Sequence, residues 1–120
     1  MGKRIFIVND GLGDRMTLRD VLISLGYQVA GEAKNGRESL EKYGSLKPDL
    51  VILDATMRDM DGVCVVRELL QQDLDANILI CAGHGQRSLA MEAVQAGARD
   101  FITKPISPRR LHKAVRRLIG

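Results

Sequence analysis

The most constraining feature of this sequence is a fivefold alternation between short strand-like runs and helix-like segments. The runs are IFIV, QVAGE, LVIL, ILIC and DFIT, at positions 5–8, 28–32, 50–53, 78–81 and 100–103. Between them, apolar residues recur at the three- and four-residue spacing of an amphipathic helix. Strands that alternate with helices form a parallel sheet with helices on both faces. The sequence therefore predicts an α/β fold with a doubly wound, five-stranded parallel sheet.

Glycine, serine and proline residues place the ends of several expected helices. Gly26 should stop the first helix, and the second should be shorter and end near Gly44. Gly97 should close the fourth helix, and Ser107–Pro108 should open the last one.

Length and composition favour a single domain over residues 1–120, because 120 residues with 45% hydrophobic content suit one core. No apolar run reaches the roughly 18 residues that cross a bilayer, and no apolar signal segment follows MGKR. We therefore expect a soluble cytoplasmic protein. Cys64 and Cys81 lie in apolar runs without metal-binding spacing, so both are expected in the core.

Polar residues gather where the expected strands end. Reading them off in chain order gives Asn9, Asp10, Glu32, Asp54 and Lys104, with Ala82 at the fourth strand. Ligands of open α/β sheets bind at this edge, where Asp10 and Asp54 converge if their strands are neighbours. Adjacent carboxylates repel unless a hard cation such as Mg²⁺ joins them. Together with Lys104 they describe a phosphoryl pocket, although each Asp alone could simply begin a turn.

Other phosphate-binding patterns are absent or incomplete. GLGDRM lacks the third glycine of a dinucleotide-binding loop because residue 16 is Met, and no P-loop is present. Phosphohydrolases of the haloacid-dehalogenase type carry D-x-D, and Thr56 occupies the second acidic place here. Both enzyme classes are therefore disfavoured.

Three segments resemble the receiver domain of two-component response regulators, in particular its single-domain chemotaxis (CheY-like) type. They are IVND, VILDATMRDMDG and AVQAGARDFITKP, and the resemblance runs from Lys3 to Leu118. It implies a flavodoxin-like (βα)5 fold with strand order 2-1-3-4-5. It also implies a signalling switch, not an enzyme acting on other substrates.

The resemblance further implies a role for each strand-end residue. Asp54 would be the phosphoacceptor, taking a phosphoryl group from a histidine kinase. Asp10, Asp54 and the backbone carbonyl of Thr56 would hold Mg²⁺, with Asn9 in the outer shell of the ion. Lys104 would contact the phosphoryl group.

Further positions would transmit and time the signal. Ala82 and Phe101 would occupy the switch positions, and Thr56 and His84 would tune how fast the phosphoryl group is lost. The Lys104–Pro105 bond is expected to be cis. A downstream protein would bind the face formed by the fourth helix, the last strand and the last helix.

Three residues depart from the family pattern. Asn9 removes one negative charge, which should weaken metal affinity by about 10–100-fold. Ala82 lacks a hydroxyl whose hydrogen bond to a charged group is worth about 1.5–3 kcal/mol. Arg58 replaces a proline and is expected to loosen its loop, while Gly83 and Gly85 should make the next loop flexible.

Two alternatives stay open. Because Asn9 and Ala82 erode the switch, the chain could be a phosphorylation-independent interaction module, or pseudo-receiver. The segment 99–120 carries seven Lys or Arg against one Asp, so nucleic-acid binding by the last helix is a further hypothesis. With only 3% aromatic residues for base stacking, nucleic acid is the weaker alternative.

Overall fold

The computed structural model describes residues 2–120 and contains one five-stranded parallel sheet in the order β2-β1-β3-β4-β5. The strands are β1 (Arg4–Val8), β2 (Gln28–Ala33), β3 (Leu50–Asp54), β4 (Ile78–Ala82) and β5 (Asp100–Thr103). The helices are α1 (Leu12–Ser24), α2 (Gly36–Leu46), α3 (Gly62–Gln72), α4 (Arg87–Ala96) and α5 (Pro108–Ile119). The predicted α/β fold and strand order are confirmed.

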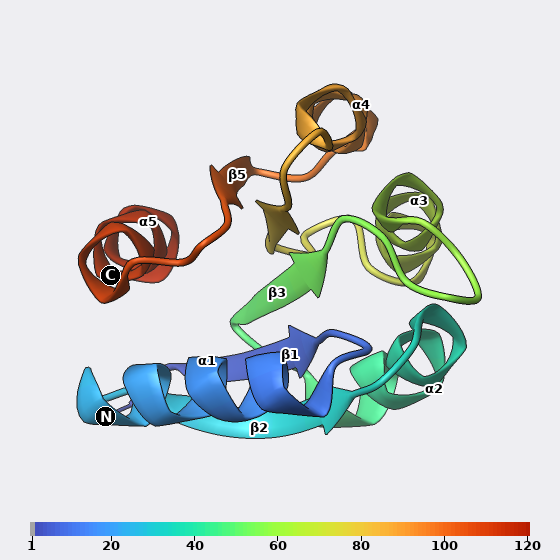
Figure 1. Ribbon diagram of the computed structural model, residues 1–120. Coiled ribbons are helices and arrows are strands. Elements are labelled where there is room, and N and C mark those ends of the chain that lie inside the picture. Colours follow the sequence, from blue (N-terminus) through green and yellow to red (C-terminus); the bar gives the residue numbers. More distant parts are fainter. Residues whose placement is uncertain (1) are drawn as a thin grey trace.

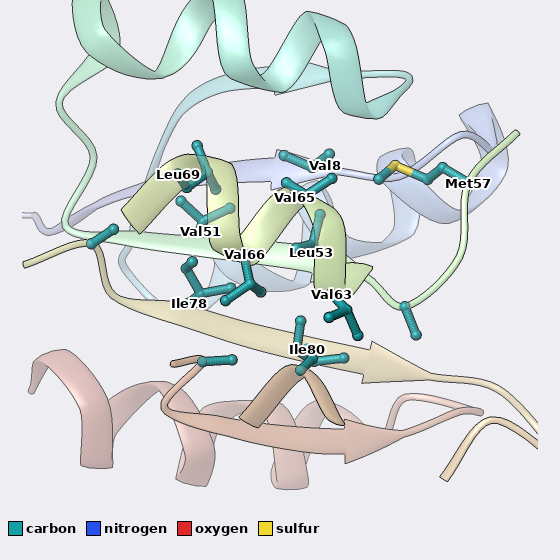
Figure 2. Packing of buried hydrophobic residues seen from close by; sticks show 14 of the residues in the cluster. Val8, Val51, Leu53, Met57, Val63, Val65, Val66, Leu69, Ile78 and Ile80 are labelled. Carbon is teal, nitrogen blue, oxygen red and sulfur yellow. The ribbon is translucent and has the colours of Figure 1, made fainter. Parts of the chain in front are cut away.

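The sheet separates two apolar layers. Helices α1 and α5 cover one face, and α2, α3 and α4 cover the other (Figure 1). Successive side chains of a strand point to opposite faces, so both layers draw on the same strands. Figure 2 shows Val51, Leu53, Ile78 and Ile80 beneath α3. Their strands, β3 and β4, are buried at every residue, which explains why those runs are apolar throughout.

Most of the expected helix ends are confirmed. Gly26 and Gly97 follow α1 and α4 with φ of 94° and 127°, and Ser107 caps α5 by accepting from the Arg110 amide. The expected end of α2 near Gly44 is wrong by two residues. The helix continues to Leu46, which packs on the core, and ends at Lys47 with φ of 46°. A glycine inside a helix costs only about 1 kcal/mol, and this contact can offset it.

The two cysteines have different environments. Cys81 is buried in β4, as expected, but the core prediction for Cys64 is wrong because Cys64 is exposed on α3. Val63, Val65 and Val66 take the buried positions of that turn. Residue 64 is thereby left on the outer side of the helix. Within residues 2–120, no helix is long and apolar enough to cross a membrane.

Candidate functional site

The site is centred on an ion pair between residues 50 positions apart. Asp54 ends β3 and is 5% exposed, and the Nζ of Lys104 lies 2.7 Å from its Oδ1. Lys104 follows β5, where its amide donates to the Ala82 carbonyl and its bond to Pro105 is cis, as expected. These main-chain features hold the base of the lysine beside β4, so that its side chain reaches Asp54.

The charges and the burial around Asp54 favour the binding of a cation. Burial raises the pKa of Asp54, and the hydrogen bond and charge of Lys104 only partly offset this effect. The nearby carboxylate of Asp10 raises the pKa of Asp54 further. Burial alone would lower the pKa of Lys104, but Asp54 and Asp14 outweigh it and raise that pKa. The pocket therefore disfavours additional uncompensated negative charge.

Asp10 and Asn9 follow β1, which lies directly beside β3 in the sheet. Asp10 is exposed at the rim, whereas Asn9 is only 2% exposed. The Oδ1 of Asn9 accepts from the Gly11 amide at 2.7 Å, so its carboxamide oxygen also closes the turn into α1. Asn9 and Lys104 line the same cavity of about 270 Å³.

Glu32 lies near the end of β2, at the same edge of the sheet, but its carboxylate makes a different contact. Its carboxylate pairs with Arg15 at 3.4 Å and with Arg19 at 3.3 Å. Arg15 also donates to the Asn9 carbonyl at 2.7 Å, which fastens α1 to the end of β1. The structure thus brings Asp10, Asp54 and Lys104 together but engages Glu32 elsewhere.

The oxygen donors suit a hard divalent cation. Asp10 lies close enough to Asp54 to affect its pKa, and Thr56 follows Asp54 by two residues. Carboxylate and carbonyl oxygens are the ligands that Mg²⁺ takes. Within residues 2–120, no three His, Cys, Asp or Glu side chains are grouped closely enough to hold a metal. An ion here would therefore need the backbone carbonyl and water as well as the two carboxylates.

The loop after Asp54 is fastened at several points, despite Arg58. Thr56 forms an antiparallel bridge with Asp61, and the Asp61 side chain caps α3. The carboxylate of Asp59 accepts from the amides of Gly36 and Arg37, both at 2.9 Å. The expected loosening at Arg58 has no counterpart in these contacts, because neighbouring residues hold the loop.

The loop between β4 and α4 holds a residue that the sequence analysis missed. The Gln86 Oε1 accepts from the Gly83 amide at 2.7 Å, and its Nε2 donates to the Thr56 Oγ1 at 2.7 Å. Ala82 is buried beside this contact, and His84 is exposed. No local pattern marks Gln86, because its partner Thr56 lies 30 residues away.

Phe101 lies on β5, where it pairs with Ile80 of β4 and is half-buried. The Arg87 guanidinium carbon is 5.6 Å from the centroid of its ring, within cation–π range. Beside it, Arg110, Lys113 and Arg117 line a shallow hollow of about 340 Å³. The β5–α5 face is therefore apolar at Phe101 and carries the basic side chains of Arg110 and Lys113 beside it, while Arg117 is paired with Asp100.

Comparisons with known proteins show the family to which this chain belongs. Residues 5–116 match the family described as the response regulator receiver domain. The chain is 47% identical to a chemotaxis protein CheY of Thermotoga maritima, over 98% of both chains, and 42% identical to that of Bacillus subtilis, over 100% of both. A chain in the crystal structure of a CheX–CheY–BeF₃–Mg²⁺ complex from Borrelia burgdorferi is 26% identical to this chain in sequence and matches it with a TM-score of 0.92. The match covers 98% of this chain and 90% of that chain.

Proposed function

Because this chain belongs to the response-regulator receiver family, we propose that it is a phosphoacceptor switch in which Asp54 takes a phosphoryl group from a histidine kinase. The observation that carries the proposal is the buried Asp54 carboxylate held against Lys104 at 2.7 Å. An Asp54 oxygen would attack phosphorus as the bond to the donor histidine breaks, and Lys104 would then neutralise a phosphoryl oxygen.

Mg²⁺ would be held by Asp10, Asp54 and the Thr56 carbonyl, and when bound it would neutralise charge on the phosphoryl oxygens. Burial and the charge of Asp10 raise the pKa of Asp54, which means that they disfavour its ionised form. A bound cation would offset both effects, and this supports the assignment. Asn9 would act through the outer shell of the ion and weaken its binding.

The phosphoacceptor assignment is tested with acetyl phosphate and with beryllofluoride, each in the presence of Mg²⁺. We expect intact mass to show one phosphoryl adduct, and amide signals around residues 54, 82 and 104 to shift with beryllofluoride. Asp54→Ala should abolish both responses. An unmodified native protein, or an Asp54→Ala variant that responds identically, would contradict the proposal.

The weakened metal site is tested by restoring the missing charge. Asn9→Asp should tighten Mg²⁺ binding by about 10-fold or more, because an outer-shell carboxylate strengthens the field at the ion. Calorimetric titration with Mg²⁺ measures the change. Gln95→Glu adds the same charge on the exposed side of α4 and should leave the affinity unchanged. Equal affinities for Asn9→Asp and the native protein would refute the role of Asn9.

A phosphorylation-independent interaction module is the second candidate, and Ala82 favours it. Without a hydroxyl at residue 82, the phosphoryl group has one contact fewer with which to shift the conformational equilibrium. This candidate predicts that beryllofluoride moves amide signals beside Asp54 but leaves those of β5 and α5 unchanged. Shifts that reach Phe101 would instead favour the switch.

The face of α4, β5 and α5 is our proposed output surface for a downstream protein. Phe101 offers an apolar centre, and Arg110, Lys113 and Arg117 give the hollow beside it a basic rim. Such a rim favours a protein segment that carries acidic residues, through electrostatic complementarity.

A further inference from the structure

Gln86 connects the two loops that flank Asp54. Its carboxamide has both a hydrogen-bond acceptor and a donor, and each forms a bond of 2.7 Å. The Oε1 accepts from the Gly83 amide, and the Nε2 donates to the Thr56 hydroxyl. The main-chain amide of Gln86 also donates to the Gly83 carbonyl at 3.1 Å. Main chain and side chain therefore close the turn 83–86, and one side-chain bond attaches that turn to the loop after Asp54.

The attachment lies beside the phosphoacceptor pair. Thr56 is two residues beyond Asp54, and Gly83 follows Ala82, whose carbonyl accepts from the Lys104 amide. A Cβ on Gly83 would lie 3.9 Å from the Cδ of Lys104, so the turn packs along the lysine side chain. The Gln86 contact thus joins the loops after β3 and β4, and Gly83 of the second loop packs against the lysine that follows β5.

This contact supplies what residue 82 cannot. Ala82 has no hydroxyl to hold the β4–α4 loop near Asp54, and the hydrogen bonds within the turn 83–86 do not reach the loop after β3, so the Gln86–Thr56 bond is what attaches this turn to that loop. We propose that Gln86 is a positioning residue: through Thr56, it clamps the β4–α4 loop over the phosphoacceptor before any phosphoryl group is present. The clamp also limits access of water to Asp54, a part of the inference that rests on the proposed function.

The clamp itself is tested in the unphosphorylated protein. Gln86→Met keeps the length of the side chain but removes both hydrogen bonds, and Thr56→Val removes only the hydroxyl. Exchange of the Gly83 amide should quicken about fivefold or more in Gln86→Met, as the loss of one hydrogen bond implies. Exchange of the Gly83 amide should also quicken in Thr56→Val. In the double variant it should be no faster than in Gln86→Met. Gln95→Met makes the same chemical change on exposed α4 and should have no effect.

Unchanged Gly83 exchange in Gln86→Met, or effects that add in the double variant, would overturn the clamp. All variants should keep the native far-ultraviolet circular dichroism. If Gln86→Met unfolds, Gln86→Leu takes its place, because leucine also lacks both hydrogen-bonding groups, and exchange of the Gly83 amide is measured in it.

The effect on chemistry has a separate readout, the lifetime of the phosphoryl group on Asp54 after acetyl phosphate is removed. We expect the lifetime to shorten several-fold and equally in Gln86→Met, Thr56→Val and the double variant, because a released loop admits water. An unchanged lifetime with faster Gly83 exchange would reject the positioning role. If the native protein takes no phosphoryl group, the proposed function fails, and Gly83 exchange alone then decides the clamp.

Discussion

Asp54 and Cys81 are direct partners across β3 and β4, and their shared burial changes the chemistry of both side chains. Burial, reinforced by the charge of Asp54, raises the pKa of Cys81 to about 12. At neutral pH almost none of this thiol is ionised, and only the thiolate is a strong nucleophile. Cys64, seventeen residues earlier, faces solvent.

The two thiols should therefore react at very different rates. A thiol reagent such as DTNB should modify one cysteine rapidly in the native protein and both after denaturation. Cys64→Ser should remove the fast reaction, whereas Cys81→Ser should retain it. Two equally fast thiols in the native protein would contradict the burial of Cys81.

At the scale of elements, side chains from loops hold the starts of helices. Asp59 belongs to the loop before α3, yet it accepts from the first amides of α2. These amides lack partners within the helix, and a carboxylate there also meets the positive end of the helix dipole. The hydrogen bond from the Arg37 amide is the largest cause of a lowered pKa of Asp59; burial opposes it, and the hydrogen bond from the Gly36 amide adds to the lowering.

Asp59→Asn should lower the free energy of unfolding by about 0.3–1 kcal/mol at pH 7, because the amide keeps an acceptor oxygen but loses the negative charge at the positive end of the helix dipole. Because the pKa is lower in the folded protein, the unfolded state binds more protons, and this stability grows as pH rises. It should be present above the ordinary carboxyl pKa near 4 and disappear as pH falls through the lowered value. Urea unfolding of both proteins between pH 3 and pH 7 measures the difference, and a pH-independent gap would contradict this account.

Two glycines provide a matched pair for the start and the middle of a helix. Gly62 begins α3, and a Cβ there would lie 3.0 Å from the Ala55 carbonyl oxygen and 3.3 Å from that of Asp54. Backbone atoms cannot give way cheaply, so Gly62→Ala should cost about 1–3 kcal/mol. Gly44→Ala lies within α2 with no neighbour closer than 4.0 Å and should instead stabilise by about 0.5–1 kcal/mol. Thermal unfolding of both variants distinguishes the two signs.

At the scale of the whole molecule, β3 and β4 join the two apolar layers into one structure. Leu53 lies beneath α3 (Figure 2) and is 0% exposed. Leu74, just beyond α3, is 88% exposed. The same substitution at the two positions therefore separates burial from residue type.

Leu53→Ala should lower the free energy of unfolding by about 2–5 kcal/mol, since it removes buried apolar surface and leaves a cavity. Leu74→Ala should change it by no more than about 0.5 kcal/mol. Urea denaturation measures both. Similar losses at the two positions would contradict the burial of β3.

Patterns within one segment carried most of the prediction. The apolar runs identified all five strands, and Gly26, Gly97 and Ser107 marked helix ends correctly. The end of α2 and the exposure of Cys64 were missed, because each depends on how a helix packs on its neighbours. For the site, strand-end positions singled out Asp54 and Lys104 before their distance was known.

The fold class, the sheet edge that carries the polar residues and the family could all be predicted from the residues alone. Burial periodicity and strand-end chemistry are local properties, so they can be read without coordinates. Which polar groups meet depends instead on how the whole chain packs. Glu32 pairs with Arg15, Asp59 caps α2, and Gln86 reaches Thr56. Such bonds join segments that are far apart in the chain, and a hydrogen bond forms only where the packed sheet brings two specific atoms within about 3 Å.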